Sequence, residues 1–453
     1  MGATNRLAHV ALAAALCFGA ATQARSEEPF YREEARDGRL YVFADSSLYE
    51  RCRAGGQLEH PLVRTAAGPA GEDLVFDGAA AVTLYEKRHA SKPAETPASH
   101  GATVTWKDNK TSLRSDHVAL DLSNRIQFRF TDQFPDQGEQ LAGTPSSGDS
   151  LGSFRIRRAK TKIDGWFWKP ELMVDFQVGW AAADSGFEGS TFSGLEDAAL
   201  TWDVSKKGAF EVKLGQFKVP FGRQELTSSE RLQFADRDIL SGEFTHSRDV
   251  GVSVQGAVLG GTLDYRAGIF NGNGRNKPTN DNSKYQYDAM VTYSPWGDTK
   301  LSEGDFESKD HPLLSVGAEF EDNDQSYSTN ANNLSWTTFG GLAVFKYRGV
   351  SLFAEVFDRK RTPQSQGAAF HSNGWHAQAG YMVVRQKLEV AFRYATWDPT
   401  DQVSGNDQSE TGGAVSYFVM GHDLKVQADF RALKDDSRGA TDHELRVQAQ
   451  FVF

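Results

Sequence analysis

Cysteine is scarce in this sequence, and no long apolar segment occurs after the first 21 residues. Cys17 and Cys52 are the only two cysteines among 453 residues. Because Cys17 lies in a leader that we expect to be removed, the mature chain cannot form an intramolecular disulfide bond. No later stretch approaches the roughly 20 continuous apolar residues that a helical membrane span requires. These absences exclude a disulfide-rich domain and a helical membrane protein.

The sequence also lacks an excess of basic charge. It contains 49 Lys and Arg against 60 Asp and Glu, which gives a formal net charge of −11. No basic stripe of the kind that binds nucleic acid is visible along the chain. We therefore expect no nucleic-acid partner.

Complete enzyme motifs are missing as well. Residues 251–255, Gly-Val-Ser-Val-Gln, end on glutamine where a nucleophile elbow requires glycine. His443 and Glu444 are followed by Val447 at the position where a zinc protease has its second histidine. The acidic residues 321–324 lack the glycine and the ligand order of a calcium loop. We expect no catalytic residues, no metal site and no cofactor, and hence no enzyme.

Residues 1–24 have the pattern of a secretory signal peptide. Arg6 precedes an apolar, alanine-rich stretch over residues 7–21, and Thr-Gln-Ala at residues 22–24 supplies small residues for cleavage. Leu16, just before the first cysteine, does not suit lipoprotein processing. We expect cleavage near Ala24 and export to the envelope.

Two regions of different character follow the leader. Residues 25–90 predict a small module, which we place in the periplasm. Its short apolar runs at residues 40–43, 73–76 and 82–85 are separated by glycine-containing turns and favour a β-containing unit. Residues 91–115 are rich in Pro, Ser, Thr, Lys and Asn, and we interpret them as a linker.

From residue 116 to residue 453, apolar and polar side chains alternate over segments of about 9–12 residues, close to the length that a tilted strand needs to cross a bilayer. In the first segment, Leu122 and Phe128 share one parity, and Arg125 and Arg129 share the other. A period of two places the side chains of a strand in two different environments. Glycine (43 residues) and aromatic residues (30 Phe, 13 Tyr and 9 Trp) are plentiful, as turns and interfacial belts require.

Short turns and long polar connections alternate along the same region. Residues 259–261 and 421–422 are examples of short turns, and residues 132–152 and 271–284 are examples of long connections. Residues 294–312 are long, but we place them on the short-turn side. Such asymmetry is typical of bacterial outer-membrane barrels, which have an even number of strands. The pattern predicts an all-β fold, a 16-stranded antiparallel transmembrane β-barrel over residues 116–453.

The last ten residues alternate in the same way. Leu445, Val447 and Phe453 share one parity, and Arg446 and Gln448 share the other. Such a strand resembles the closing strand of an outer-membrane barrel. A soluble all-β protein is the alternative, because its strands also alternate. Strand length, outward aromatic residues and this final strand oppose that alternative.

One connection differs from the others. About 30 residues separate the strand that ends near Phe217 from the one that resumes at Val250, a length that favours a functional loop. By our count this is the third long loop, and we expect it to fold inward, because a barrel of about 16 strands is otherwise wide enough for water. It carries five charges of each sign: Lys218, Arg223, Arg231, Arg237 and Arg248 against Glu225, Glu230, Asp236, Asp238 and Glu243.

Several stretches of the chain resemble one known family. Residues 214–222, Leu-Gly-Gln-Phe-Lys-Val-Pro-Phe-Gly, are followed by Thr-Ser-Ser at residues 227–229. The further stretches lie at residues 247–251, 267–272, 293–297 and 421–427. Together they resemble the phosphate-selective porin O and P family, over about residues 118–453. The resemblance implies a homotrimeric outer-membrane channel of 16 strands, embedded in outer-membrane lipid, with an inward-folded third loop.

Members of this family that select phosphate line their pore with basic side chains. We therefore predict that Arg125, Arg129, Arg155 and Arg157 line the anion path, and that Lys218, Arg223 and Arg231 lie at the constriction. Ordinary charges on a wet wall are the alternative for the first group, and salt bridges to Glu225 and Glu230 that hold the loop are the alternative for the second.

The parity of the second strand is ambiguous. If Phe154 and Ile156 face outward, Arg157 faces inward. Arg158, Lys160 and Lys162 then fall on the outward parity. Either a bulge shifts the phase after Arg157, or these cations face a protomer interface or the rim.

The functional expectation is a water-filled channel for passive diffusion of small solutes, with small anions such as phosphate in transit. A general porin without selectivity is one alternative, suggested by the negative charge balance. The other is a structural barrel whose N-terminal module tethers a periplasmic partner.

Overall fold

The computed structural model describes residues 29–65, 67, 72–89, 101–136, 151–181, 194–277, 279–325, 334–364 and 367–453. Contacts divide the chain into two compact units, Met1–Ser99 and His100–Phe453, which are described separately. The predicted signal peptide lies outside the described residues. No helix in the described ranges is long and apolar enough to span a membrane.

The first unit contains a small sheet with two helices. Its elements are β1 (Arg32–Arg36), β2 (Arg39–Phe43), α2 (Ser46–Arg53), β3 (Leu62–Arg64), β4 (Asp73–Phe76) and α3 (Ala79–His89). The strand order is β1-β2-β4-β3, with β2 and β4 parallel. The buried core includes Val42, Leu74, Phe76, Ala81 and Tyr85.

Two of the three strands predicted in this unit are present. Residues 40–43 fall in β2 and residues 73–76 form β4. The interpretation of residues 82–85 as a β-type run was wrong, because they lie in α3. Ala81 and Tyr85, four residues apart, form the buried face of that helix, and the preceding alanines favour helix more strongly than Val82 opposes it.

The linker predicted for residues 91–115 was wrong in its second half. Thr103–Lys107 (β5) and Lys110–Ser115 (β6) pair as an antiparallel hairpin. Asp108 and Asn109 form its turn with φ values of 52° and 57°, the left-handed conformation that two-residue hairpin turns require. The alternation in Thr-Val-Thr-Trp before Asp-Asn was the missed signal.

The second unit is a closed antiparallel barrel, as predicted. Its strands are β7 (Val118–Phe134), β8 (Leu151–Phe167), β9 (Leu172–Gly179), β10 (Leu195–Asp203), β11 (Glu211–Lys218), β12 (Arg248–Val258), β13 (Leu263–Phe270), β14 (Gln286–Tyr293), β15 (Leu313–Gln325), β16 (Leu334–Tyr347), β17 (Val350–Pro363), β18 (Phe370–Val384), β19 (Leu388–Asp398), β20 (Gln408–Met420), β21 (Leu424–Asp435) and β22 (Ala440–Val452). β22 pairs with β7, which closes a ring of 16 strands within the described residues. The predicted strand number is confirmed.

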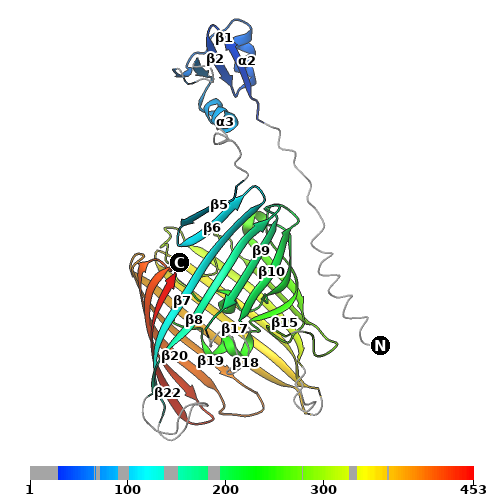
Figure 1. Cartoon of the computed structure of the whole chain (residues 1–453), viewed down its shortest axis with the longest axis vertical. Helices are drawn as coiled ribbons and strands as arrows, with labels where there is room; N and C mark the ends of the chain where they lie inside the picture. The colour runs from blue at the N-terminus through cyan, green and yellow to red at the C-terminus, as the bar shows by residue number, and fades with distance from the viewer. Residues whose placement is uncertain are drawn as a thin grey trace. The chain divides into compact units, whose positions relative to one another are not determined.

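The two ends of the barrel differ in their connections. We call the end where β7 begins and β22 ends the turn rim, and the opposite end the loop rim (Figure 1). At the turn rim, residues 348–349 and 421–423 are short links, and residues 294–312 form the one long link between described strands. Residues 219–247 and 271–285 are long links that start from the loop rim. The predicted alternation of short and long connections is therefore present.

The distribution of polarity is the reverse of that in a soluble protein. The outward parity carries exposed apolar residues such as Phe128, Phe154 and Ile156. The inward parity carries fully buried polar residues such as Arg393 and Gln448. A soluble sandwich would bury its apolar faces, so this arrangement excludes the soluble alternative and fits a barrel that faces lipid.

A bulge between β7 and β8 resolves the ambiguous parity. Gln127 pairs with Arg158, whereas the next residue, Phe128, pairs with Ile156. Arg157 is therefore the extra residue, which shifts the phase of the strand on its two sides. The bulge, and not a protomer interface or the rim, therefore explains the parity of Arg158, Lys160 and Lys162. These three cations face the lumen.

Candidate functional site

The inner loop, residues 219–247 between β11 and β12, packs against the inside of the barrel wall. It contains two short helices, α5 (Arg223–Leu226) and α6 (Ile239–Phe244). On one side, Phe221, Leu240 and Phe244 join a buried cluster with Phe357 and Trp397 of the wall. This apolar contact holds the loop inside the barrel because burial of aromatic side chains is strongly favourable.

Two carboxylates of the wall, Glu319 and Glu355, bind the backbone of the inner loop. The Gly222 N–H donates to the Glu319 carboxylate, and the Gln224 N–H donates to the Glu355 carboxylate at 3.1 Å. At Gly222 φ is +73°, and an added Cβ would lie 2.3 Å from a Thr245 side-chain carbon, so only glycine fits here. The start of α5 is thereby fixed by charge-assisted hydrogen bonds.

Residues 294–312 also fold into the barrel, from the turn rim. Glu303 accepts hydrogen bonds from the Gln224 side chain (2.9 Å) and from the Gln233 N–H (2.7 Å), both in the inner loop. Lys346 of the wall donates to the carbonyls of Thr299 and Ser302 at 2.8 Å. The sequence placed this segment at the correct rim but did not predict that it folds inward. It fills part of the lumen beneath the inner loop.

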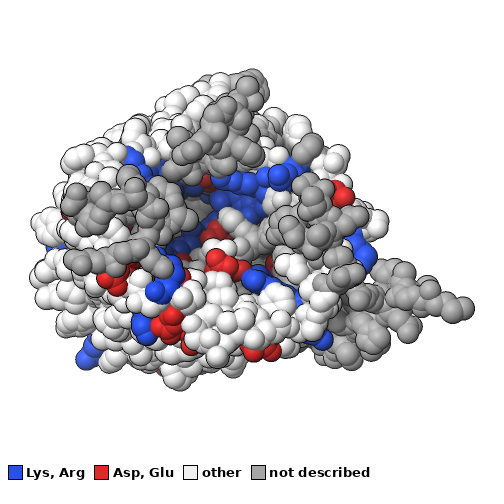
Figure 2. Space-filling model, turned by 90° about the horizontal axis from the view of Figure 1, so that it is seen from below, with Lys and Arg blue, Asp and Glu red and all other residues white. Residues whose placement is uncertain are grey.

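A cavity of about 920 Å³ lies beside β7–β13, lined by the wall and the inner loop. Its lining contains eleven basic residues: Arg125, Arg157, Arg158, Lys160, Lys162, Lys213, Lys218, Arg237, Arg248, Arg266 and Arg275. It contains five acidic residues: Asp175, Glu196, Asp197, Glu225 and Glu230. Blue Lys and Arg side chains gather along one side of the hollow at the loop rim (Figure 2). The lining therefore has a formal charge of +6 in a chain whose net charge is −11.

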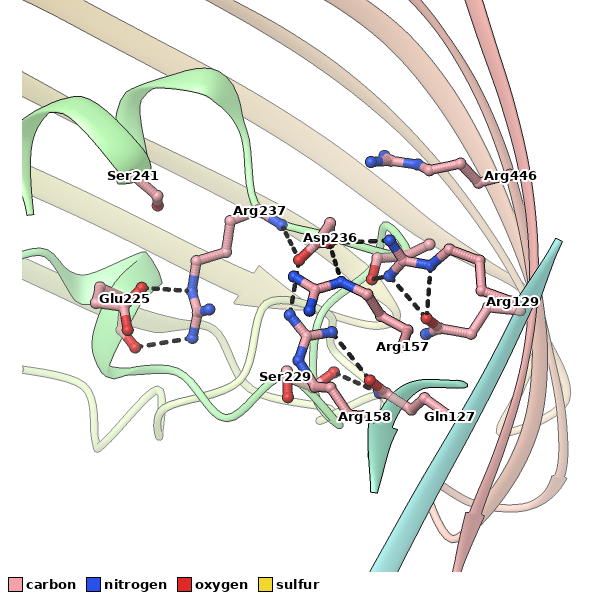
Figure 3. Close-up of polar contacts among 12 residues, drawn as sticks. Gln127, Arg129, Arg157, Arg158, Glu225, Ser229, Asp236, Arg237, Ser241 and Arg446 are labelled. Carbon is pink, nitrogen blue, oxygen red and sulfur yellow. Dashed lines mark hydrogen bonds and ion pairs between the residues drawn. The ribbon is translucent and has the colours of Figure 1, made fainter. Parts of the chain in front are cut away.

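Asp236 of the inner loop binds three arginines of the wall (Figure 3). Its carboxylate lies 2.9 Å from Arg129 Nη1, 3.0 Å from Arg157 Nε and 2.8 Å from Arg158 Nη2. Two adjacent residues of one strand normally point to opposite faces. Arg157 and Arg158 reach the same carboxylate because the bulge lies at Arg157. A second cavity of about 470 Å³ adjoins this cluster and is also lined by Arg237, Arg431 and Arg446 among others.

The charge balance at Asp236 favours its ionised form. Burial acts to raise the pKa of this carboxyl group, but the positive charges of Arg158, Arg157 and Arg129 outweigh burial and hold the pKa well below its ordinary value. One carboxylate therefore compensates three guanidinium groups, and the cluster keeps an excess of positive charge.

A second cluster surrounds Glu196 on β10. Glu196 contacts Lys160, Arg248 (3.3 Å) and Arg275 (3.8 Å). Arg248 also makes a two-pronged contact with Asp197, at 3.0 and 2.9 Å. The cations of the wall are thus paired with carboxylates that the protein itself supplies. Sequence reasoning missed this cluster, because its members come from β8, β10, β12 and the link between β13 and β14, which come together only in the fold.

The four arginines predicted for the anion path lie in different surroundings. Arg125 and Arg157 line the larger cavity. Arg125 also contacts Ser228 and Glu230 at 3.1 Å. Arg129 is fully buried behind the cavity, where it binds Asp236 and Gln448. Arg155 is exposed and pairs across the strands with Arg129, which places it on the inward face.

The three cations predicted for the constriction contact other groups of the protein. Lys218 lines the cavity and donates to the carbonyls of residues 225–227. Arg223 is buried away from the cavity and donates to Thr299 at 3.0 Å. Arg231 lies 3.6 Å from Glu230 and is half exposed. The contact of Arg231 with Glu230 is the kind of salt bridge named in the alternative. Arg223 instead holds the inner loop to residues 294–312 through hydrogen bonds to Thr299 and Lys300.

Arg359 of β17 fixes the end of α6. It donates to the carbonyls of Glu243 (2.7 Å) and Phe244 (2.6 Å), and to Glu321 (2.6 Å). We expect Arg359→Lys to loosen the inner loop, because lysine keeps the charge but not the planar fork, and each lost hydrogen bond is worth about 1 kcal/mol. Single-channel current noise should rise in this variant. Arg348→Lys, at an exposed turn, serves as the control; equal noise in both would contradict the role of Arg359.

Comparisons with known proteins agree with this fold. Residues 139–453 match the family model described as phosphate-selective porin O and P. A relative from Aquifex aeolicus (strain VF5), described as an uncharacterized protein, is 23% identical over 273 residues, which are 54% of this chain and 64% of the relative. The chain thus aligns with less than two thirds of that relative's length.

Two solved structures illustrate the structural similarity. The anion-selective porin from Comamonas acidovorans superposes with a TM-score of 0.52 at 13% identity, covering 74% of this chain and 99% of that one. The outer membrane channel DcaP of Acinetobacter baumannii superposes with a TM-score of 0.50 at 13% identity, covering 74% and 97%. At these identities the similarity concerns the fold alone.

Proposed function

The chain belongs to the phosphate-selective porin O and P family of outer-membrane channels, and from this premise we propose that its channel favours small anions, phosphate among them. The observation that carries the proposal is the charge of the cavity lining, eleven basic against five acidic residues. Fixed charge at a narrow point decides which ions pass, because there a solute sheds water and neighbouring charges are poorly screened.

The route for an anion follows the basic side of the wall. Lys162, Lys160 and Arg158 project inward from β8, beyond the bulge, and all three line the cavity. Each of them also contacts a carboxylate of the protein: Lys162 lies 3.3 Å from Asp164, Lys160 contacts Glu196, and Arg158 contacts Asp236. A passing anion exchanges with these carboxylates instead of filling empty sites. Binding then remains weak enough for release, as conduction requires.

The proposal predicts the sign of a reversal potential. Purified protein in a planar bilayer with a KCl gradient should give a potential that indicates chloride over potassium, and added phosphate should reduce the chloride current. A potential near zero would favour the general porin, for which the five acidic residues of the lining are the supporting observation. A cation-selective potential would contradict the anion proposal and leave the channel intact.

The proposal also covers the number of chains in the assembly and the location of the N-terminal module. We infer a homotrimer from family membership, and chemical cross-linking of membrane-embedded protein should then give a three-chain product; a monomer alone would contradict it.

We also propose that residues 1–24 are removed and that residues 25–90 lie in the periplasm. If the protein is instead a structural barrel whose module tethers a periplasmic partner, deletion of the module should weaken the envelope and leave conductance unchanged.

A further inference from the structure

The β5–β6 hairpin completes a part of the sheet that β22 does not reach. β22 pairs with β7 from Arg125 onward, and Phe453 exchanges backbone hydrogen bonds with Asn124 at 2.6 and 2.9 Å. β7 begins seven residues earlier, at Val118. β6 pairs with this extension over residues 118–122. The hairpin thus covers a strand edge that would otherwise be open at the turn rim, beside the end of the chain (Figure 1).

One face of the hairpin continues the outer surface of the barrel. Val104 pairs with Leu113, which pairs with Leu120 of β7. Residues directly opposite each other in a sheet share a face. Leu120 has the same parity as Ile126 and Phe128, the exposed apolar residues of β7.

Trp106 lies in the adjacent row of the same face. It pairs with Thr111, which pairs with Leu122 of β7. Val104 and Trp106 are 68% and 67% exposed, more than most apolar residues of the strands. An apolar surface that is continuous with the lipid-facing wall therefore extends onto the hairpin.

The opposite face of the hairpin is polar. Thr105 pairs with Ser112, whose hydroxyl donates to Asp121 at 2.7 Å. Asp121 also contacts Arg114 and has the inward parity of β7. At the tip, the Asn109 side-chain amide donates to Asp423 of the β20–β21 turn at 2.9 Å. The hairpin is therefore fixed to the barrel with its apolar face outward.

We propose that this hairpin is a membrane-interface element, whose Val104 and Trp106 insert among the phospholipids of the leaflet at the turn rim. Tryptophan is suited to this position, because its ring is apolar and its N–H group can bond to headgroups or water. Lys107 and Lys110 pair across the tip on the same polar face as Thr105 and Ser112, which leaves the outward face apolar. Continuity with the lipid-facing wall favours lipid as the occupant over a protein partner.

This role is separate from the passage of anions. The hairpin, like β7, precedes residue 139, where the family match begins. Its position also fixes residues 101–102, the described start of the second unit, at the membrane surface.

Fluorescent labels on the two faces of β5 test the proposal. In the full chain with Cys52→Ser, a single cysteine is introduced by Trp106→Cys, with Val104→Cys as a second variant of the same face and Thr105→Cys as the matched control. Each is labelled with an environment-sensitive dye and reconstituted in vesicles of phosphatidylethanolamine and phosphatidylglycerol. Quenching is measured with iodide in water and with doxyl groups attached near the lipid headgroup.

The two faces should respond in opposite ways. Labels at residues 104 and 106 should be quenched by the lipid-bound doxyl group and be roughly threefold less accessible to iodide than the label at residue 105, as expected for an interfacial side chain. Equal iodide quenching at all three positions would overturn the proposal. So would a disulfide-linked dimer of the Trp106→Cys variant, because it would show that a second copy covers this face.

Discussion

Replacing Arg157 and Arg158 together by glutamine is expected to reduce the anion preference of the channel at least about fivefold, because two unit charges about 4 Å apart interact by about 1 kcal/mol even in water. Both residues line the larger cavity, and their removal lowers its formal charge from +6 to +4. Glutamine keeps much of the side-chain length and hydrogen-bonding capacity, so the bulged strand should be retained. The measurement is the reversal potential in a salt gradient.

A matched control separates local charge from total charge. Arg348→Gln with Arg385→Gln removes two positive charges from exposed turns outside the cavity lining. The net charge of the protein changes equally in the two double variants. If the control shifts the reversal potential as far as the cavity variant does, the basic wall is not the selective element.

Replacing Asp236 by asparagine should have the largest effect on stability. The change removes the carboxylate that binds Arg129, Arg157 and Arg158 and leaves three guanidinium groups without their shared partner. Loss of one member of a buried ion pair typically costs about 3–5 kcal/mol. We expect a lower thermal midpoint for the variant, measured in detergent at low ionic strength.

The same variant should also acquire a dependence on added anions. Phosphate or sulfate can occupy the position of the missing carboxylate, and a ligand that binds the folded state raises its apparent stability. Added phosphate should therefore restore much of the lost midpoint in Asp236→Asn. Asp310→Asn, at a side chain that is 93% exposed, should show neither the loss nor the rescue. A variant destabilised but insensitive to phosphate would show that the cluster does not accept external anions.

The barrel could be predicted from the sequence because its signal is local. A period of two, strand lengths suited to a bilayer and alternating connections are properties of consecutive residues, and they fixed the class of fold and the number of strands. Arg125 and Arg157 were placed at the cavity by the same parity argument. The hairpin at residues 103–115 was missed because its composition is that of a linker, although the alternation in its first strand was visible.

The centre of the site could not be predicted in the same way. Asp236 was one of five acidic residues in a loop with balanced charge, and nothing in its sequence neighbourhood distinguishes it. Its role arises from contacts with β7 and β8, more than 70 residues away along the chain. The inward course of residues 294–312 was hidden for the same reason, because Glu303 finds its partners only in the folded lumen.

The bulge at Arg157 makes the electrostatics of the lumen depend on the number of residues in β8 as well as on their identity. Deleting Arg157 would remove the extra residue and leave Ile156 outward and Arg158 inward in a regular ladder, whereas deleting Ala159 would place either Arg158 or Lys160 on the lipid side. A substitution in this strand alters one side chain, whereas a single-codon insertion or deletion away from the bulge inverts the exposure of the residues on one side of it. Natural variation in this strand should therefore proceed by replacement at constant length.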